Sequence, residues 1–350
     1  MRVRTEPPVV ILMGPTGAGK SVLALTLAKK FNGEIISADS RQIYVGMDIG
    51  TDKLVSSQQG PHFAKASRGK TENRDKPISV EGVPHYLIDI LTPDQRYSAA
   101  EFRDDAQRFI VDMHQRGKFP IVVGGTGFYV RVLTGHRSLP NVPPDPAFRA
   151  WAEEQPLTAL VDELRERAPD LYAQVDNPRN KQRVVRVLEI ARGRLGAGGR
   201  VSGVGVSNPT PETQHPTPVQ FLKLTLLPPA DVLHERLTAR VEDEFRRGFV
   251  DEVRRLVTQY GESAPGLQAV GYRQVLPYLR NERTLDETQQ AVLRAHRDYA
   301  RRQLTWLKKE PALVRVTSPS EAHRAITAFL QVKKAGSTRF NRHHSPLPLL

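Results

Sequence analysis

The chain has 350 residues, with 51 Lys and Arg against 38 Asp and Glu and a formal net charge of +13. Its length favours two domains, and its basic excess favours an anionic partner such as a nucleic acid, with a generally basic surface as the alternative. The chain has no cysteine, which excludes disulfides, thiolate zinc sites, iron–sulfur ligation and a thiol nucleophile.

The first predicted elements are a strand, a glycine-rich loop and a helix. Val9–Leu12 is an apolar run, residues 14–21 read GPTGAGKS, and Ser21–Lys30 has helical periodicity. Glycines allow backbone N–H groups to face an anion at the positive end of the helix, while Lys20 adds a charge and Ser21 a hydroxyl for Mg²⁺. A coincidental glycine turn is the alternative. The pattern predicts binding of a di- or triphosphate without specifying ATP.

The second predicted strand ends on a carboxylate. Residues 33–39 (GEIISAD) form a short apolar run, and Asp39 opens the tetrapeptide Asp39-Ser40-Arg41-Gln42. Ligands of open α/β sheets bind at the carboxyl ends of strands, so Asp39 is expected to face the phosphate loop. It is a candidate general base or Mg²⁺-linked residue. A helix cap, a turn residue and a nucleotide contact in a kinase remain alternatives.

A third strand is predicted at residues 119–124, followed by Gly124-Gly125-Thr126-Gly127 and a helical run. The glycines permit a close backbone approach, and Thr126 can donate a hydrogen bond at the start of the helix. A purely structural turn is the alternative. The strand does not end on the acidic residue with which ATPases hold Mg²⁺, which disfavours hydrolysis as the main activity.

A charged helical segment is predicted between Asp145 and about Gly193. Between Arg179 and Arg200 there are seven cations and a single acid, Glu189. Gln182, Arg183 and Arg186 lie within about one helical turn, whereas Val184, Val185 and Leu188 can face a core. The imbalance favours binding of a phosphate backbone over a merely solvated helix face. The segment therefore predicts a small helical insertion that contacts nucleic acid.

The remaining chain completes the core. Residues 219–227 and 313–316 read as strands, so the sheet is built from both ends of the chain. Polar or Gly- and Pro-rich stretches at 55–80, 192–218 and 333–350 predict loops or a tail. The expected fold class is α/β, a P-loop NTPase-like core with a parallel sheet flanked by helices plus a small all-helical insertion domain. The expected borders are 1–143, 144–206, 207–332 and a flexible basic tail at 333–350.

Several motifs occur together in one order. They are GPTGAGKS, ISADSRQIY, DIGTDK, HYLIDIL, YSAAEFR, IVVGGTGFY, NKQRVVRVLE, LQAVGYRQ and RRQLTWLKK. From about Val9 to Lys309 the chain resembles the bacterial tRNA dimethylallyltransferase family. The resemblance implies transfer of a dimethylallyl group from dimethylallyl diphosphate to N6 of the adenine 3′ of the anticodon, with Mg²⁺ as cofactor and the tRNA anticodon stem-loop as partner. The loop would then hold pyrophosphate, the leaving group.

The resemblance also implies roles for individual residues. Catalytic roles fall to Asp39, which would take the proton from N6, and to Thr126 and Lys20. Diphosphate would be bound by Gly14, Pro15, Thr16, Gly17, Ala18, Gly19, Lys20, Ser21 and Arg240, with Ser21 on the metal. The tRNA would be contacted by Asp39, Ser40, Arg41, Gln42, Thr126, Arg149, Gln182, Arg183, Val184, Val185 and Arg186. Glu244 departs from the family, which commonly has an apolar residue there.

Three other functions remain open. A related enzyme could prenylate free adenine nucleotides, although it would not need the basic segment 179–200. A nucleoside or shikimate-type kinase would use ATP, and a non-enzymatic NTPase module would bind nucleic acid without forming a prenyl product. No apolar stretch approaches the about 20 residues that span a bilayer, and residues 1–8 lack a secretory signal. We expect a cytoplasmic monomer with no membrane partner.

Overall fold

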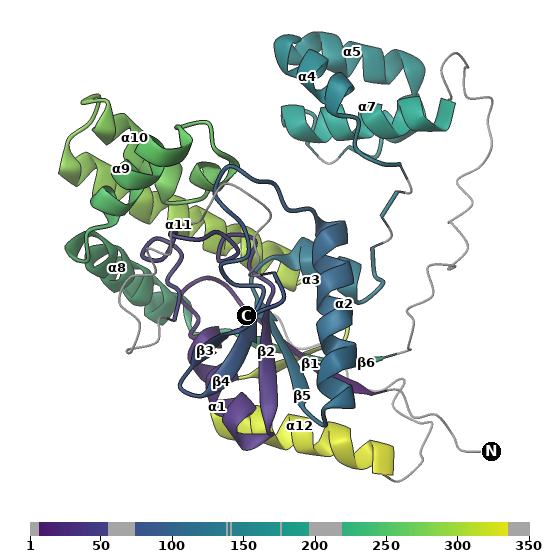
Figure 1. Ribbon diagram of the computed structural model, residues 1–350, viewed down its shortest axis with the longest axis vertical. Helices are drawn as coiled ribbons and strands as arrows, with labels where there is room; N and C mark the ends of the chain where they lie inside the picture. The colour runs from purple at the N-terminus through teal and green to yellow at the C-terminus, as the bar shows by residue number, and fades with distance from the viewer. Residues whose placement is uncertain are drawn as a thin grey trace. The chain divides into compact units, whose positions relative to one another are not determined.

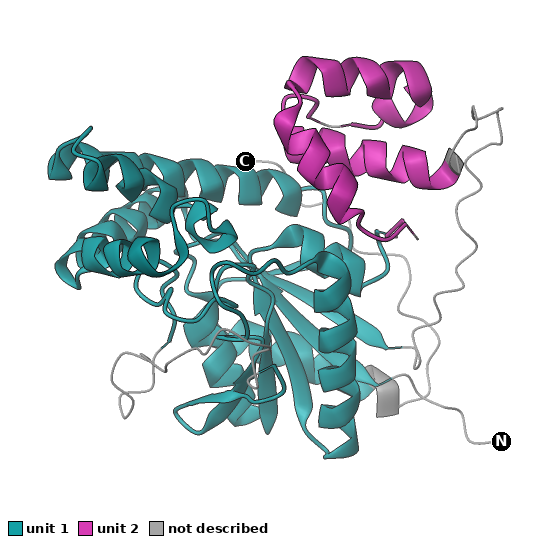
Figure 2. Ribbon diagram, turned by 45° about the horizontal axis from the view of Figure 1, so that its top comes forward, with its two compact units in different colours: residues 1–137, 215–350 teal, residues 138–214 magenta. Residues whose placement is uncertain are grey.

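The computed structural model describes residues 7–54, 74–137, 139–140, 142–175, 177–195 and 219–334. The chain divides into two compact units: residues 1–137 with 215–350 form unit 1, and residues 138–214 form unit 2 (Figure 2). Most of the predicted tail and of the two predicted loops lies outside the described residues. Where these predictions meet the described residues they are wrong at 78–80, which form a strand, and at 192–195 and 333–334, which end helices. No helix among the described residues is long and apolar enough to cross a membrane.

Unit 1 is built around a seven-stranded sheet with the order β3-β4-β2-β5-β1-β6-β7 (Figure 1). Neighbouring strands are parallel except β3 and β4, which are antiparallel. The strands are β1 (Pro8–Met13), β2 (Gly33–Ser37), β3 (Ile78–Val80), β4 (Val83–Tyr86), β5 (Phe119–Gly124), β6 (Gln220–Leu226) and β7 (Leu313–Val316). This arrangement confirms the α/β fold class and a sheet assembled from both ends of the chain.

The central strands are apolar along their whole length because helices cover both faces of the sheet. In β1, Leu12 is paired with Val123 of β5 on one side and with Leu224 of β6 on the other. The β3–β4 hairpin was not predicted. It is short, and its two-residue turn places Glu81 and Gly82 at positive φ, the geometry of a tight hairpin turn.

Helices α1 and α12 pack together against one face of the sheet, and α2 packs against α3 (Figure 1). Helices α8, α9, α10 and α11 form a separate helical layer in which α11 contacts both α8 and α10. The helices of unit 1 are α1 (Lys20–Lys30), α2 (Ala99–Gln115), α3 (Gly127–Leu133), α8 (Ala230–Arg246), α9 (Phe249–Tyr260), α10 (Tyr272–Leu279), α11 (Leu285–Leu307) and α12 (Pro319–Lys334), with a 3₁₀ turn at Pro265–Gln268.

In the described residues of unit 2, all regular structure is helical. Its helices are α4 (Pro146–Glu154), α5 (Leu157–Arg167), α6 (Pro169–Tyr172) and α7 (Lys181–Leu195). Val184, Val185 and Leu188 of α7 are buried in one apolar cluster with side chains of α4, α5 and α6. The helical periodicity therefore predicted the inward face of α7 correctly.

Candidate functional site

Three neighbouring strands, β1, β2 and β5, bring the predicted core residues together. Their carboxyl ends lead into the glycine-rich loop, Asp39 and Thr126. The backbone N–H of Ser40 donates to Thr126 Oγ1 at 3.2 Å, and the N–H of Thr126 donates to the carbonyl of Ala38 at 3.3 Å. The segment after β2 and the turn after β5 are thus joined directly, beside the loop after β1.

The loop after β1 has the backbone that its glycines allow. A Cβ atom at Gly14 would lie 2.6 Å from the carbonyl oxygen of Leu226, so only glycine fits. Gly19 precedes α1 with φ of 88°, a conformation that glycine adopts readily. Lys20 Nζ donates to the carbonyl of Pro15 at 2.7 Å, so this side chain curls over the loop. Burial lowers the pKa of Lys20 to about 8, while Asp39 opposes this shift.

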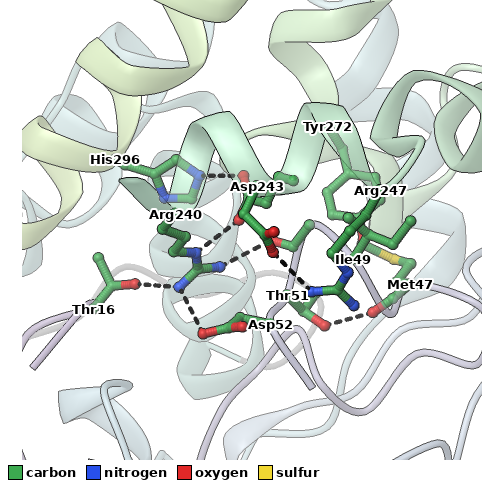
Figure 3. A network of polar contacts seen from close by, with 12 residues as sticks. Thr16, Met47, Ile49, Thr51, Asp52, Arg240, Asp243, Arg247, Tyr272 and His296 are labelled. Carbon is green, nitrogen blue, oxygen red and sulfur yellow. Dashed lines mark hydrogen bonds and ion pairs between the residues drawn. The ribbon is translucent and has the colours of Figure 1, made fainter. Parts of the chain in front are cut away.

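Thr16 at the centre of this loop is held from two helices. Its backbone N–H donates to Gln303 Oε1 of α11 at 2.8 Å. Its Oγ1 accepts from Arg240 Nη1 of α8 at 2.9 Å (Figure 3). Gln303 Nε2 also donates to the carbonyl of Gly125 at 3.0 Å. Sequence reasoning did not identify Gln303, although it lies within the motif RRQLTWLKK.

Arg240 lies against the loop and against the segment after β2. Its Nη2 donates to the carbonyl of Gly50 at 3.3 Å, and its Nη1 lies 3.8 Å from Asp52 Oδ2. Its Nε donates to Glu244 Oε1 at 2.7 Å. Arg236, one helical turn earlier in α8, donates to the carbonyl of Ala18 at 3.2 Å. Two guanidinium groups of α8 therefore flank the glycine-rich loop.

Asp39 is partly exposed, and its Oδ1 accepts the backbone N–H of Arg41 at 2.8 Å. Burial raises the pKa of Tyr299 in α11 to about 12, and the nearby charge of Asp39 adds to this rise. Tyr299 therefore lies within electrostatic range of the candidate base, Asp39. Gln42 also makes internal bonds, since its amide donates to the carbonyl of Thr51 at 3.3 Å.

Trp306 of α11 packs against α3. A Cβ atom at Gly127 would lie 2.5 Å from its indole ring, so the ring rests on the first turn of α3. This contact explains the last glycine of the GGTG turn.

In unit 2, the predicted nucleic-acid residues have different environments. Gln182 and Arg183 are exposed on α7, whereas Arg149 and Arg186 donate to the buried carboxylate of Glu189. Burial raises the pKa of Glu189, but its bonds to the two arginines lower it below the usual value overall. Glu189 was seen only as a lone acid in a basic run, and no sequence signal indicated that it anchors two cations.

Val184 and Val185 were included among the predicted tRNA contacts. Their side chains are 0% and 7% exposed in the core of unit 2. These two side chains pack inward on α7, and contact of the two residues with tRNA stays a prediction.

The described residues contain no group of three or more His, Asp or Glu side chains placed to hold a metal ion. Ser21, at the start of α1, is partly exposed beside the glycine-rich loop. This donor set fits Mg²⁺, which commonly takes one or two protein ligands and fills its other positions with phosphate oxygens and water.

Known proteins resemble this chain over nearly its whole length. The model of the IPP transferase family matches residues 42–310. The tRNA dimethylallyltransferase of Thermomicrobium roseum is 40% identical over 308 residues, covering 86% of this chain and 84% of that protein. The enzyme of that name from Carboxydothermus hydrogenoformans is 33% identical over 335 residues, covering 95% and 98%.

Among solved structures, the full-length tRNA isopentenylpyrophosphate transferase from Bacillus halodurans superposes with a TM-score of 0.64 at 31% identity, covering 95% of this chain and 99% of that one. A second, from Staphylococcus epidermidis, gives a TM-score of 0.61 at 27% identity. These similarities extend over both units and confirm the resemblance carried by the ordered motifs. The chain belongs to the IPP transferase family.

Proposed function

We propose that this protein transfers a dimethylallyl group from dimethylallyl diphosphate to N6 of the adenine 3′-adjacent to the anticodon in tRNA, releasing pyrophosphate. The observation that carries the proposal is the adjacency of an anion-binding loop and a carboxylate. Lys20 and Arg240 border that loop, which follows β1. Asp39 follows β2, and only β5 lies between β2 and β1 in the sheet. A prenyl transfer needs both features at one site.

The loop suits a leaving diphosphate. The bond between the allylic carbon and oxygen breaks in the reaction, so negative charge builds up on the departing pyrophosphate. Loop N–H groups, the ammonium of Lys20 and the guanidinium of Arg240 can bind that charge. Bound Mg²⁺, with Ser21 as its protein ligand, would add positive charge at the same oxygens. ATP could compete for this loop, but transfer does not consume it.

Asp39 suits the role of general base. The amino group of adenine is a poor nucleophile because its lone pair is delocalised into the ring, so its proton must be removed as the new C–N bond forms. The hydrogen bond from Arg41 N–H holds the Asp39 carboxylate at one oxygen and leaves the other available. Thr126 and Ser40, which are joined by a hydrogen bond, can orient the adenine beside Asp39.

The tRNA requires a larger surface than the reacting base. An adenine in an anticodon loop must leave its stack, which costs a few kcal/mol and is offset by protein contacts. Gln182 and Arg183 present exposed polar and cationic groups for phosphates, and Arg149 and Arg186 can contribute their remaining donors. We include action as a monomer in the cytoplasm, where tRNA is found, in the same proposal.

The test combines purified protein, Mg²⁺ and unmodified tRNA with either dimethylallyl diphosphate or ATP. The tRNA is then digested and its nucleosides are analysed by mass. We expect prenylated adenosine only with the allylic donor, at the position 3′ of the anticodon. A tRNA with that adenine replaced serves as the matched control.

AMP replaces tRNA in a parallel reaction, which distinguishes a free-nucleotide prenyltransferase. Consumption of ATP without a prenylated product would contradict the proposal and favour a kinase or NTPase. Prenylation of AMP in preference to tRNA would contradict the assignment of the acceptor.

A further inference from the structure

Three buried polar atoms behind Arg240 have no hydrogen-bond partner among the described residues. They are Oε2 of Glu244 and both ring nitrogens of His296. The two side chains are 2% and 4% exposed, and His296 Nε2 lies 3.6 Å from Glu244 Oε2. Buried polar atoms are nearly always bonded, and an unmet one is costly. The pair therefore retains a capacity for one more proton and one more hydrogen bond.

This pair is connected to the glycine-rich loop. Glu244 Oε1 accepts from Arg240 Nε, and Arg240 Nη1 donates to Thr16 (Figure 3). His296 thus lies at one end of a chain of contacts whose other end is the candidate diphosphate site. Apart from Thr16, the residues connected in this way are side chains of α8 or α11. These two helices pack against each other, so the position of each side chain depends on its neighbours.

The buried charge of Glu244 is neutralised only while Arg240 is paired with it. Burial raises the pKa of Glu244, but Arg240 and then His296 bring it below the usual value, so the carboxylate is ionised at neutral pH. A diphosphate at the loop would compete with Glu244 for the charge of Arg240. Once that charge is shared, Glu244 is left as an incompletely neutralised buried carboxylate, and such a group raises the pKa of an adjacent imidazole.

Few other charges can take part. From α8, His296 faces Glu244 and, beyond it, Arg240. In the turn before α10, Gly271 lies near the His296 ring and carries no charge. The hydroxyl of Tyr272, the next residue, donates to Glu252 of α9. The charge of α3, Arg131, is paired with Glu310 after α11. On the far side of Arg240 are Asp52 and Lys20.

We propose that Glu244 and His296 are positioning residues for Arg240, and that His296 takes up a proton from solvent when a diphosphate binds. The inference rests on the proposed function, because it requires a diphosphate at this loop. The protonated imidazole donates to Glu244 Oε2. Its positive charge then neutralises Glu244 in place of Arg240, whose charge is shared with the ligand. No covalent bond other than the N–H bond on the imidazole is formed.

The identity of residue 244 agrees with this role. The family resemblance leads one to expect an apolar residue there, where no second partner would be needed. A buried carboxylate at that position needs a cation, supplied by Arg240, and a partner for its second oxygen. His296 is the side chain that the fold places at that oxygen.

The test is calorimetric titration of Mg²⁺ and inorganic pyrophosphate into the full chain near pH 6.5, in two buffers with different heats of ionisation. Protons that pyrophosphate itself gains or loses on binding contribute equally in all variants, so they cancel in the comparison. We expect the native protein to take up a few tenths of a proton more per pyrophosphate than His296→Gln or Glu244→Gln. The double variant should match either single variant, since His296 acts through Glu244. Glu235→Gln, which removes an exposed charge from the same helix, should keep the native uptake.

Affinity gives a second readout. Between pH 7.5 and 6, native affinity for pyrophosphate should rise relative to His296→Gln by up to about tenfold per pH unit, because a proton is taken up with the ligand. In the transfer reaction, KM for the allylic diphosphate should change while kcat is largely retained. A residue that only supports the fold would not produce this pH-dependent difference.

The outcomes separate this inference from the proposed function. If the native protein does not bind pyrophosphate, the proposed function fails with it. If the native protein binds pyrophosphate and both single variants show native proton uptake, only the positioning role is overturned. Should the variants not fold, NMR spectra of the His296 ring in the native protein decide the matter. Pyrophosphate added at fixed pH must move its ring signals toward those of the protonated form, and unchanged signals contradict the inference.

Discussion

The backbone N–H of Thr16 donates a 2.8 Å hydrogen bond to Oε1 of Gln303, which lies 287 positions later in the chain. The other end of the same amide donates to the carbonyl of Gly125 at 3.0 Å. Gln303 is 3% exposed. One side chain of α11 therefore joins the loop after β1 to the turn after β5, and both loops carry candidate site residues.

Replacement of Gln303 by leucine should destabilise unit 1. Leucine has a similar size but leaves the N–H of Thr16 and the carbonyl of Gly125 without partners, and each unmet buried group costs about 1–3 kcal/mol. The measurement is the free energy of unfolding from denaturant titration. Gln290→Leu, at an exposed position of the same helix, should change that energy by no more than about 0.5 kcal/mol. Equal effects of the two substitutions would remove the bridging role from Gln303.

Asp39→Asn should abolish most of the prenyl transfer while tRNA binding stays within a few-fold. Asparagine keeps an oxygen that can accept the N–H of Arg41, so the local backbone is retained, but it cannot take a proton. A positioned base typically contributes about 10²–10⁴-fold to a rate. Single-turnover rates at saturating substrates, together with tRNA affinity, test this. An unchanged rate would rule out Asp39 as the base.

Diphosphate affinity should decrease as the pH rises above about 8. Burial lowers the pKa of Lys20 to about 8, so in the free protein its ammonium is charged below that pH and neutral above it. A bound anion favours the charged form, and each lost proton weakens binding by up to about tenfold per pH unit. Pyrophosphate affinity between pH 7 and 9.5 measures the effect. Lys20→Arg remains charged over this range and should lack the decrease. If the affinities of both proteins decrease alike, a group other than Lys20 causes the decrease.

Arg183→Ala should weaken tRNA binding and reduce its salt dependence. Each phosphate contact contributes about 0.7–0.9 to the slope of log affinity against log salt concentration, so loss of one contact lowers the slope by about that amount. Filter binding at several salt concentrations provides the slope. Arg167→Ala removes the same charge from α5 of the same unit and should leave the slope close to native. If the slope is unaltered in Arg183→Ala, the exposed face of α7 is merely solvated.

Local patterns were sufficient for the central sheet and for the backbone of the glycine-rich loop. β1 and β5 are covered on both faces, so they appear in the sequence as unbroken apolar runs, and the glycines around Lys20 need particular backbone angles that few other residues adopt. The β3–β4 hairpin was missed because strands of three and four residues at a sheet edge carry too little periodicity to be distinguished from a polar loop.

Helical periodicity and family resemblance gave different answers for α7. The 3.6-residue repeat correctly placed Val184 and Val185 toward a core, whereas the matched motif grouped them with the tRNA contacts. The structure confirms the inward direction of the two side chains, while the tRNA contact of the two residues stays a prediction. The same core placed Glu189 beneath Arg149 and Arg186, a relationship that spacing along one helix cannot reveal.

The sequence by itself determined the fold class, the family, the loop around Lys20 and the position of Asp39 at a strand end, because each depends on residues close together in the chain. The tertiary structure decided which distant side chains complete that site. Four side chains, Gln303, Arg240, Glu244 and His296, lie behind or beside the loop only because α8 and α11 pack against each other and contact the loops after β1 and β5. Hydrogen bonds and buried charges depend on distances of a few ångströms, and such distances between remote residues are set by packing.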